Sequence, residues 1–529
     1  MRDFHFPGRS TAHSKNGMAA TSQPAATLTA IDILRAGGNA IDAAVGAAAV
    51  LSVVEPQSTS IGGDCFCLYI PGGDMLKAIA VNGSGKAPAG ASIEFFQNEG
   101  IEHIGLTTPH AVSVPGAVDA WTSILDKFGS MSLREIFSDA INYADKGYVV
   151  TPRIHCDWAG HVDKLLLTES ATEKLLIEGR APKPGEMMRN PWLADTLRVI
   201  ADQGRNGFYA GKVAEDIVNY LNSLGGIHTL EDFFIQDTEF IKPISTSYRG
   251  KKIYAIPPSN PGLTTLMILN ILEGFDLASL GSTSGERLHL MAEATRLAYN
   301  AREENVGDPN YVDFDIERLI SKEWAEEARK KISHDCVMEM DYISPPAHPD
   351  TVYLSVVDKD RNVVSFINSV FYSFGSGLVT PKTGIVLQNR GAGFRLKPGH
   401  PNCIEPGKRP LHTITPGMLS EDGRAIMSFG VMGGQYQPVG QSQIVTNVID
   451  YGMDVQEAID LPRSFWFEGI YQLEKGFPEE TKLKLNSLGH TIGSIDPPHG
   501  GGQAIKIDWK MGTLEGGSDP RKDGIALGY

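Results

Sequence analysis

The sequence of 529 residues is poor in cysteine and has no pattern that would join its cysteines. The five cysteines are scattered and odd in number, and no pair has the CxxC spacing of a zinc or redox site: Cys65, Cys67, Cys156, Cys336 and Cys403. A disulfide framework and a structural zinc site are therefore not expected, and the pattern favours a reducing compartment. The 14 histidines form no ligand-like cluster along the sequence, so no metal and no other cofactor is predicted.

An excess of positive charge and long apolar segments are also missing. The net charge of −16 argues against a nucleic-acid partner, which would require a basic face. The longest uncharged apolar run, Ala43 to Val54, is too short to cross a bilayer. The first residues, Met1 to Phe6, contain no apolar segment typical of a secretory signal. We therefore expect a cytoplasmic protein that binds neither nucleic acid nor membrane.

Several common catalytic motifs are absent as well. The sequence contains no G-x-x-x-x-G-K-[ST] phosphate loop, no H-E-x-x-H zinc motif and no G-x-S-x-G. The nearest approach to the last motif, Gly281 to Gly285, has Thr283 at the nucleophile position. No repeat of a fixed period is visible. None of these three motifs therefore supports a function for this chain.

The N-terminal part of the chain predicts two helices. Residues 19–36 have a helical pattern that ends at Gly37, where glycine can adopt the left-handed conformation. Asn39 is the predicted N-cap of a second helix, Ala40 to Val54, with Asp42 in its first turn. The small side chains of this second helix predict close packing and burial.

Later segments mix helices with strands. Most of 119–332 has a helical pattern, including an apolar helix from Leu263 to Leu272. Strands are predicted at Ile385 to Leu387 and at Arg424 to Val431. The segment between the helical part and residue 351, residues 333–350, is polar and rich in turn formers, so we expect it to be exposed.

A β-hairpin is the strongest local prediction. Val352 to Val357 reads as a strand, a charged turn follows, and Val363 to Ser369 returns as a second strand. If the turn is symmetric about Asp360, Thr351 lies opposite Ser369. Directly opposed residues have Cβ atoms about 4.5–5.5 Å apart, which lets two hydroxyl groups share a hydrogen bond.

The hairpin sequence resembles the start of the small subunit in the γ-glutamyltransferase (glutathione hydrolase) family. The matching residues are Thr351, Ser355 to Asp360 and Asn362. Further similarity covers essentially the whole chain, at Ile33 to Ala44, Val114 to Val118, Gly307 to Pro309 and Gly512 to Arg521. The resemblance implies an α+β fold of the N-terminal nucleophile hydrolase type, an αββα sandwich with two stacked, mainly antiparallel sheets between helical layers.

The resemblance also implies that the chain cuts itself before Thr351. Residues 1–350 would form the large subunit and residues 351–529 the small one, and both would belong to one sandwich. The two fragments would stay together as a heterodimer, which could dimerise further. Cleavage of the Asp350–Thr351 bond would free the α-amino group of Thr351.

The chemistry of threonine explains why such a cut would create a catalyst. A threonine hydroxyl is a weak nucleophile that needs a base within hydrogen-bond reach. A free α-amino group has a pKa of about 7.7–8.0 and can act as that base, whereas an amide nitrogen cannot. The resemblance places Ser369 at the family's second hydroxyl residue and Gly433 and Gly434 at its oxyanion glycines. Two backbone N–H groups there would stabilise the tetrahedral oxyanion.

The sequence departs from the family where γ-glutamyl substrates are held. Ser84 stands at the position of the arginine that binds the substrate's α-carboxylate, and Gly393 at that of the aspartate that binds its α-amine. His412 and Thr413 replace a pair of serines. Without a bidentate arginine, much of the amino-acid specificity should be lost. This pattern resembles the acylase-like branch of the family, with cephalosporin acylase-like and small-amide hydrolases.

Other residues are candidates for binding the substrate. Asn389, Arg390, His412 and Thr413 are predicted to line the acyl site, and Phe371 stands where the family has an asparagine. Arg390 could hold a differently placed carboxylate, as could Lys86, or either could be a solvated surface charge.

The sequence thus predicts an autoprocessing N-terminal threonine amidohydrolase, or acylase, acting on a small amide. One alternative is a γ-glutamyltransferase or glutathione hydrolase with replacement contacts. An alternative of a different class is an unprocessed, inactive homologue that binds a ligand or a partner.

Overall fold

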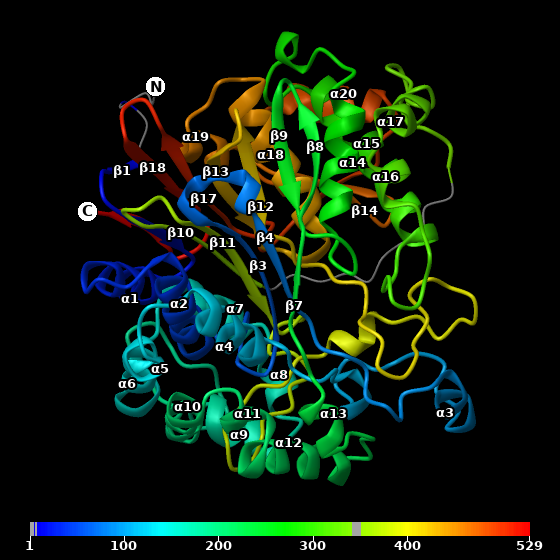
Figure 1. Cartoon of the computed structure of the whole chain (residues 1–529). Coiled ribbons are helices and arrows are strands. Elements are labelled where there is room, and N and C mark those ends of the chain that lie inside the picture. The colour runs from blue at the N-terminus through cyan, green and yellow to red at the C-terminus, as the bar shows by residue number, and fades with distance from the viewer. Residues whose placement is uncertain (1–4, 6–7, 341–350) are drawn as a thin grey trace.

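Two seven-stranded antiparallel sheets lie face to face in the middle of the molecule (Figure 1). The computed structural model describes residues 5, 8–340 and 351–529. The strands of the first sheet are, in spatial order, β1 (Ala12–Ser14), β18 (Thr513–Ser518), β17 (Gly502–Asp508), β13 (Arg424–Val431), β12 (Gly417–Glu421), β9 (Lys251–Ala255) and β8 (Ile244–Tyr248). The strands of the second sheet are β19 (Ile525–Gly528), β2 (Met18–Thr21), β10 (Val352–Val357), β11 (Val363–Ser369), β3 (Asp64–Ile70), β4 (Ile79–Gly83) and β7 (Glu239–Ile241).

Side chains of the second sheet alternate between two apolar cores. On β10, Val352, Leu354 and Val356 pack against the helices that cover this sheet. Tyr353 and Val357 point the other way, into the core between the two sheets. The period of two follows from strand geometry. Thr351, one residue before β10, therefore belongs to the face that looks toward the other sheet.

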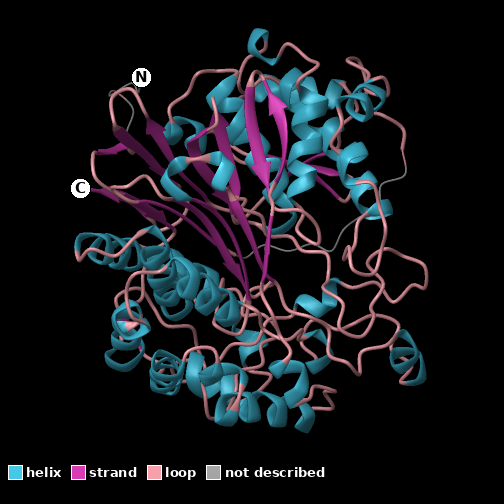
Figure 2. Cartoon of the chain, in the orientation of Figure 1, coloured by secondary structure: helices cyan, strands magenta, loops and turns pink. Residues whose placement is uncertain are grey.

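One helical layer covers the outer face of the second sheet (Figure 2). The helices nearest the sheet are α1 (Pro24–Arg35), α2 (Ala40–Val54) and α4 (Ala117–Phe128). Outside them lie α5 (Leu133–Ile136), α6 (Ser138–Lys146), α7 (Pro152–Ala159), α8 (Val162–Leu165), α9 (Glu169–Leu175), α10 (Pro191–Gln203), α11 (Asn206–Tyr209), α12 (Gly211–Ser223) and α13 (Leu230–Phe234). As predicted, α2 is buried along its whole length and begins with a capping box in which Asn39 and Asp42 bond to each other's backbone N–H groups.

A second helical layer covers the outer face of the first sheet. It consists of α14 (Gly262–Leu272), α15 (Gly285–Asn305), α18 (Gln437–Ile449) and α19 (Val455–Asp460), flanked by α16 (Ile316–Leu319), α17 (Lys322–Arg329) and α20 (Glu479–Ser487). Smaller elements are α3 (Ile93–Asn98), the pair β5 (Tyr148–Val149) and β6 (Met187–Met188), and a sheet of β14 (Ser464–Phe467), β15 (Ile470–Leu473) and β16 (Ile492–Ser494). Helices, two sheets and helices are stacked in that order, which confirms the predicted α+β, αββα sandwich.

Two predictions of secondary structure were wrong. The helix expected over residues 19–36 begins only at Pro24, because Met18–Thr21 forms strand β2 between β10 and β19. Pairing with strands far away in the sequence overrides the local preference here. The strand expected at Ile385 to Leu387 does not form; Val386 and Leu387 each make a single isolated bridge.

In both sheets, strands from after residue 351 lie between strands from before it. In the second sheet, β10 and β11 lie between β2 on one side and β3 on the other. In the first sheet, the run from β18 to β12 lies between β1 and β9. Thr351 is the first described residue after the gap, and Asp350, on the other side of the predicted cleavage bond, lies outside the described residues.

The described residues include all five cysteines of the chain. Cys65, Cys67, Cys156, Cys336 and Cys403 are all free thiols. Among the described residues, no helix combines the length and the apolar character needed to cross a membrane.

Candidate active site

Thr351, Ser369 and Asp64 lie side by side at one end of three neighbouring strands. The hairpin has the predicted register, since Val352 pairs with Asn368 and Val357 with Val363. Ser369 is in turn the partner of Asp64 on β3. The Thr351 hydroxyl donates to Ser369 Oγ over 3.3 Å, and all three side chains are at most 1% exposed. The hairpin thus brings two hydroxyl groups and a carboxyl group to one buried spot between the sheets.

Ser369 Oγ is also contacted by the segment that follows its own strand. It accepts the backbone N–H of Phe371 over 2.9 Å and a guanidinium N–H of Arg390 over 3.3 Å. Phe371 has a φ of +81°, which is unusual for a bulky residue. Its ring lies 4.4 Å from the Arg390 guanidinium carbon, a cation–π distance. The strained backbone of Phe371 therefore holds both the serine oxygen and the arginine in place.

The two glycines at the family's oxyanion positions stand between β13 and α18. Gly433 and Gly434 have φ angles of +110° and +56°, which side chains disfavour. Neither N–H group donates to an acceptor within the described residues. Gln437, the first residue of α18, donates its side-chain N–H to Thr351 Oγ1 over 3.4 Å. This contact places the glycine turn close to Thr351.

Arg390 is buried completely, which excludes the solvated surface charge considered for it. It belongs to a short 3-10 turn, η5 (Arg390–Gly393), and donates to Thr413 Oγ1 over 2.9 Å. Its Nε lies 4.0 Å from Asp64 Oδ2. Burial lowers the pKa of Arg390 to about 10, against the opposing effect of Asp64, so the guanidinium stays charged at neutral pH.

Asp64 is the member of this site that the sequence did not single out. Its Oδ1 accepts N–H groups from Gly85 over 2.9 Å, Gly116 over 3.1 Å and Gln388 over 3.0 Å. Burial raises the pKa of Asp64 to about 6, and Arg390 partly offsets this rise. A carboxyl group at the head of an otherwise apolar strand was the available signal, because buried carboxylates need compensating partners.

His412 and Asn389 are placed differently from each other. The His412 ring packs edge-on against Phe66, and its Nε2 lies 3.6 Å from Asp64 Oδ2. Burial and the nearby Arg390 lower the pKa of His412 well below its usual value, so the ring is neutral. Asn389 uses its side chain within the protein: its oxygen accepts the N–H of Tyr372 and its amide donates to the carbonyl of Leu106. Asn389 orders the segment that carries Arg390.

The residues at the family's charged-clamp positions do not form a clamp here. Ser84 donates its hydroxyl to Asn82 Oδ1 over 2.6 Å. A Cβ atom added to Gly393 would lie 3.8 Å from the ring of Phe371, so an aspartate would have room but is absent. Lys86 is paired with Asp237, and both side chains are partly exposed.

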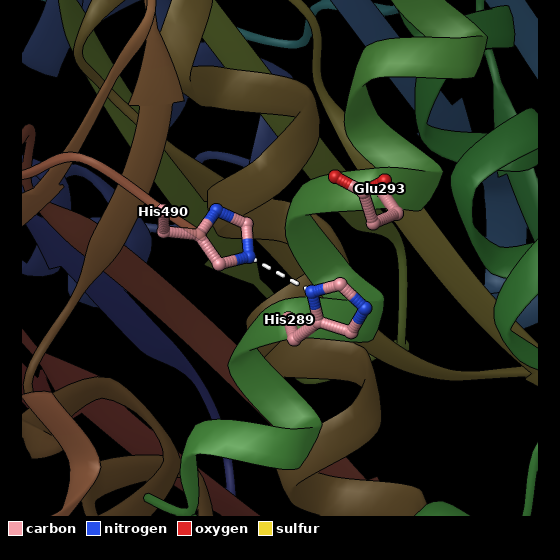
Figure 3. Close-up of side chains that lie close together, drawn as sticks. All are labelled: His289, Glu293 and His490. Carbon is pink, nitrogen blue, oxygen red and sulfur yellow. Dashed lines mark hydrogen bonds between the residues drawn. The ribbon is translucent and has the colours of Figure 1, made fainter. Parts of the chain in front are cut away.

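A separate cluster of ligand-type residues lies on α15 and beside it (Figure 3). His289 and Glu293 are on successive turns of α15, and His490 faces His289 with 2.8 Å between the ring nitrogens. The other nitrogen of His289 bonds to the carbonyl of Ser333. The two Glu293 oxygens bond to Arg296 and to the N–H of Met338. Through these contacts the cluster holds residues 333–338 against α15.

Comparison with known proteins identifies the family. The model of the γ-glutamyltranspeptidase family matches residues 26–529. The chain is 38% identical to the glutathione hydrolase-like YwrD proenzyme of Bacillus subtilis, over 94% of this chain and 95% of that protein. It is 34% identical to the oxamate amidohydrolase proenzyme of Klebsiella pneumoniae, over 98% and 99% of the two chains. The solved structure of a cephalosporin acylase from Bacillus halodurans superposes with a TM-score of 0.93 at 38% identity, covering 100% of this chain and 99% of that one.

These matches define the class of protein as an N-terminal nucleophile hydrolase. The chain belongs to the γ-glutamyltranspeptidase family and to its acylase-like branch, as the resemblance predicted. It is therefore an enzyme of the hydrolase and acyltransferase type.

Proposed function

We propose that this chain cuts itself before Thr351 and then hydrolyses a small amide through an acyl-enzyme on that threonine. The observation that carries the proposal is the buried contact between Thr351 and Ser369 beside two glycine N–H groups. In a single arrangement it supplies a nucleophile, a second hydroxyl group and candidate oxyanion donors.

In the proposed processing step, the Thr351 hydroxyl attacks the carbonyl carbon of Asp350. The peptide bond breaks as the amide nitrogen takes a proton, and an ester is left. Water then hydrolyses the ester and frees the α-amino group of Thr351. The fragments of 350 and 179 residues stay together because strands of the smaller fragment lie between strands of the larger one in both sheets.

In the proposed turnover, the free α-amino group takes the proton of the Thr351 hydroxyl as the oxygen attacks the substrate carbonyl. The N–H groups of Gly433 and Gly434 stabilise the oxyanion, each worth about 2.7–4 kcal/mol if well aimed. The amine leaves with a proton, and water releases the acid from the acyl-enzyme. An amine in place of water would give transfer.

The acyl group is proposed to carry a carboxylate that pairs with Arg390. This residue is a buried cation that is linked to Thr351 through Ser369. Since each of the two contacts is 3.3 Å long, the guanidinium lies no more than about 6.6 Å from the nucleophile. That spacing favours an acid group close to the scissile carbonyl. The relative named for oxamate, the monoamide of the shortest dicarboxylic acid, supports the same substrate class.

A substrate panel tests this proposal on processed enzyme. Because Ser84 and Gly393 replace the charged clamp, oxalyl and glutaryl amides are expected to exceed γ-glutamyl amides in kcat/KM by tenfold or more, about 1.4 kcal/mol in transition-state binding. Initial rates with 4-nitroanilides of the three acids measure it. A tenfold lead for the γ-glutamyl compound would replace the acylase with an ordinary γ-glutamyltransferase. One uncut band on a denaturing gel, with no hydrolysis, would instead indicate an inactive binding protein.

Substituting Ser369 with alanine is expected to slow processing or turnover by about 10–100-fold, equivalent to roughly 1.4–2.7 kcal/mol of barrier. The change removes the hydroxyl that contacts Thr351 and Arg390. Quantifying the cut fragment against time, and kcat on the cut enzyme, measures the two effects. Ser365→Ala is the matched control, since Ser365 is buried on the same face of β11 and contacts Tyr353 instead. Equal effects in both variants would make the role of Ser369 purely structural.

A further inference from the structure

Three buried polar atoms face one another beside the nucleophile without a hydrogen-bond partner among the described residues. They are Asp64 Oδ2, Arg390 Nε and His412 Nε2. Asp64 Oδ2 lies 4.0 Å from Arg390 Nε and 3.6 Å from His412 Nε2, both longer than a hydrogen bond. The atoms come from β3, from η5 and from the loop before β12. The fold therefore joins three distant segments into one cluster, in which the proposed chemistry uses Arg390 but gives no role to Asp64 or His412.

The terminal nitrogens and the Nε of the Arg390 guanidinium have different neighbours in this cluster. Its terminal nitrogens point to Thr413 and Ser369, on the side of the nucleophile. Its Nε, a different nitrogen of the guanidinium, lies 4.0 Å from Asp64 Oδ2. A substrate carboxylate would take the terminal nitrogens, because that edge of the fork suits bidentate pairing. Arg390 would then lie between two carboxyl groups.

Two carboxylates sharing one buried cation leave one negative charge uncompensated. His412 does not offset it, since the imidazole ring is held neutral. Like charges in one site are relieved when one of the groups binds a proton. The substrate acid is fixed by its pairing with Arg390, so the proton goes to Asp64.

We propose that Asp64 takes up one proton when Arg390 binds the carboxylate of the acyl group. The enzyme then prefers anionic amides at a pH where Asp64 can be protonated, and it loses this preference at a higher pH. The inference rests on the proposed amide hydrolysis and names its specificity control. The proton comes from solvent and resides on Oδ2, opposite the unprotonated ring of His412. Asp64 acts through Arg390 and is thus a positioning residue.

The groups that face Asp64 allow this linkage to be observed near neutral pH. Burial raises the pKa of Asp64 to about 6 before any ligand binds, and an anionic ligand raises it further. Besides Arg390 and His412, the neighbouring groups are Tyr209 of α11 and Cys65 of β3, whose pKa values burial raises, so both stay neutral. The α-amino group of processed Thr351 titrates as well. Its effect on the chemical step is common to all amides and cancels in a ratio of substrates.

The test compares an anionic with a neutral substrate on processed wild-type enzyme. Oxalyl 4-nitroanilide carries the carboxylate, and pyruvoyl 4-nitroanilide has an acetyl group in its place. The ratio of their kcat/KM values, measured from pH 5 to 9, is expected to be constant at low pH and to fall by tenfold or more between pH 6 and 8. The ratio falls as the pH rises because deprotonated Asp64 repels the carboxylate of the anionic substrate. A ratio that does not change with pH overturns the proposal.

The variant Asp64→Asn supplies the second measurement. Its amide oxygen can still accept the N–H groups of Gly85 and Gly116, but the side chain carries no charge at any pH. The ratio is expected to become independent of pH, and an unchanged pH dependence would contradict the role of Asp64. Asp216→Asn is the control, since Asp216 is a buried carboxylate that bonds Thr383 away from this site and should leave the wild-type slope.

The outcomes separate this inference from the proposed function. If cut enzyme hydrolyses both anilides with a constant ratio, the amidase assignment stands and the role of Asp64 fails. If cut enzyme hydrolyses neither of them nor any other amide of the panel, the proposed function fails. Should Asp64→Asn not fold or not cut, the wild-type ratio alone decides.

Discussion

Replacing Thr351 with alanine is expected to leave one chain of 57.2 kDa, whereas the unchanged protein gives two bands. The variant lacks the oxygen that attacks Asp350, so no ester forms and no α-amino group is released. Amide hydrolysis should fall by at least about 1,000-fold, roughly 4 kcal/mol of barrier. Denaturing electrophoresis with N-terminal sequencing of the smaller band, which should begin at Thr351, provides the measurement.

Thr351→Ser is the matched control for this experiment. Serine keeps a hydroxyl group at the same place and should still cut, with changed rates. Normal processing of the alanine variant would show that Thr351 is not the nucleophile. A smaller band that begins at another residue would place the cut elsewhere.

Arg390→Gln is expected to lower kcat/KM for oxalyl 4-nitroanilide by about 100-fold or more, equivalent to roughly 2.7 kcal/mol. Glutamine keeps one donor but loses the charge and the two-pronged geometry that suit a carboxylate. The neutral pyruvoyl analogue should lose less, because it has no anion to pair. The measurement compares the fold decrease in kcat/KM for oxalyl 4-nitroanilide with the fold decrease for pyruvoyl 4-nitroanilide.

Lys86 provides the control for Arg390. It is the other cation that the sequence offered, but it is paired with Asp237 and partly exposed. Lys86→Gln should change the oxalyl rate less than twofold, since exposed ion pairs contribute about 0–1 kcal/mol. If Lys86→Gln lost the activity and Arg390→Gln kept it, the carboxylate would bind at the other cation.

The hairpin could be predicted residue by residue because its information is local. The β-branched run and the short turn around Asp360 determine which residues face each other, and the structure has that register. The start of β13 at Arg424 and the capping box at Asn39 were likewise readable from neighbouring residues. Contacts within about ten residues leave a pattern in the sequence.

What the sequence could not supply depends on contacts between distant segments. Asp64 belongs to the site because it lies next to Arg390, which is more than 300 residues later in the sequence. The residues around Asp64 give no sign of this contact, and neither do those around Arg390. Arg390 could have been a surface charge until the fold buried it completely. Residues 19–21 were expected to be helical but belong to strand β2, because β10 and β19 pair with it.

Strands from after residue 351 lie between strands from before it, and this affects whether the protein can refold once it has unfolded. An uncut chain refolds by a first-order process, whatever its concentration. In a cut protein, β2 and β3 belong to one polypeptide, while β10 and β11, which lie between them, belong to the other. Once unfolded, the halves must find each other again, so recovery becomes second order and fails on dilution. The cut enzyme would then stay folded because its unfolding barrier is high, which is kinetic stability. A molecule that unfolded after the cut would not refold.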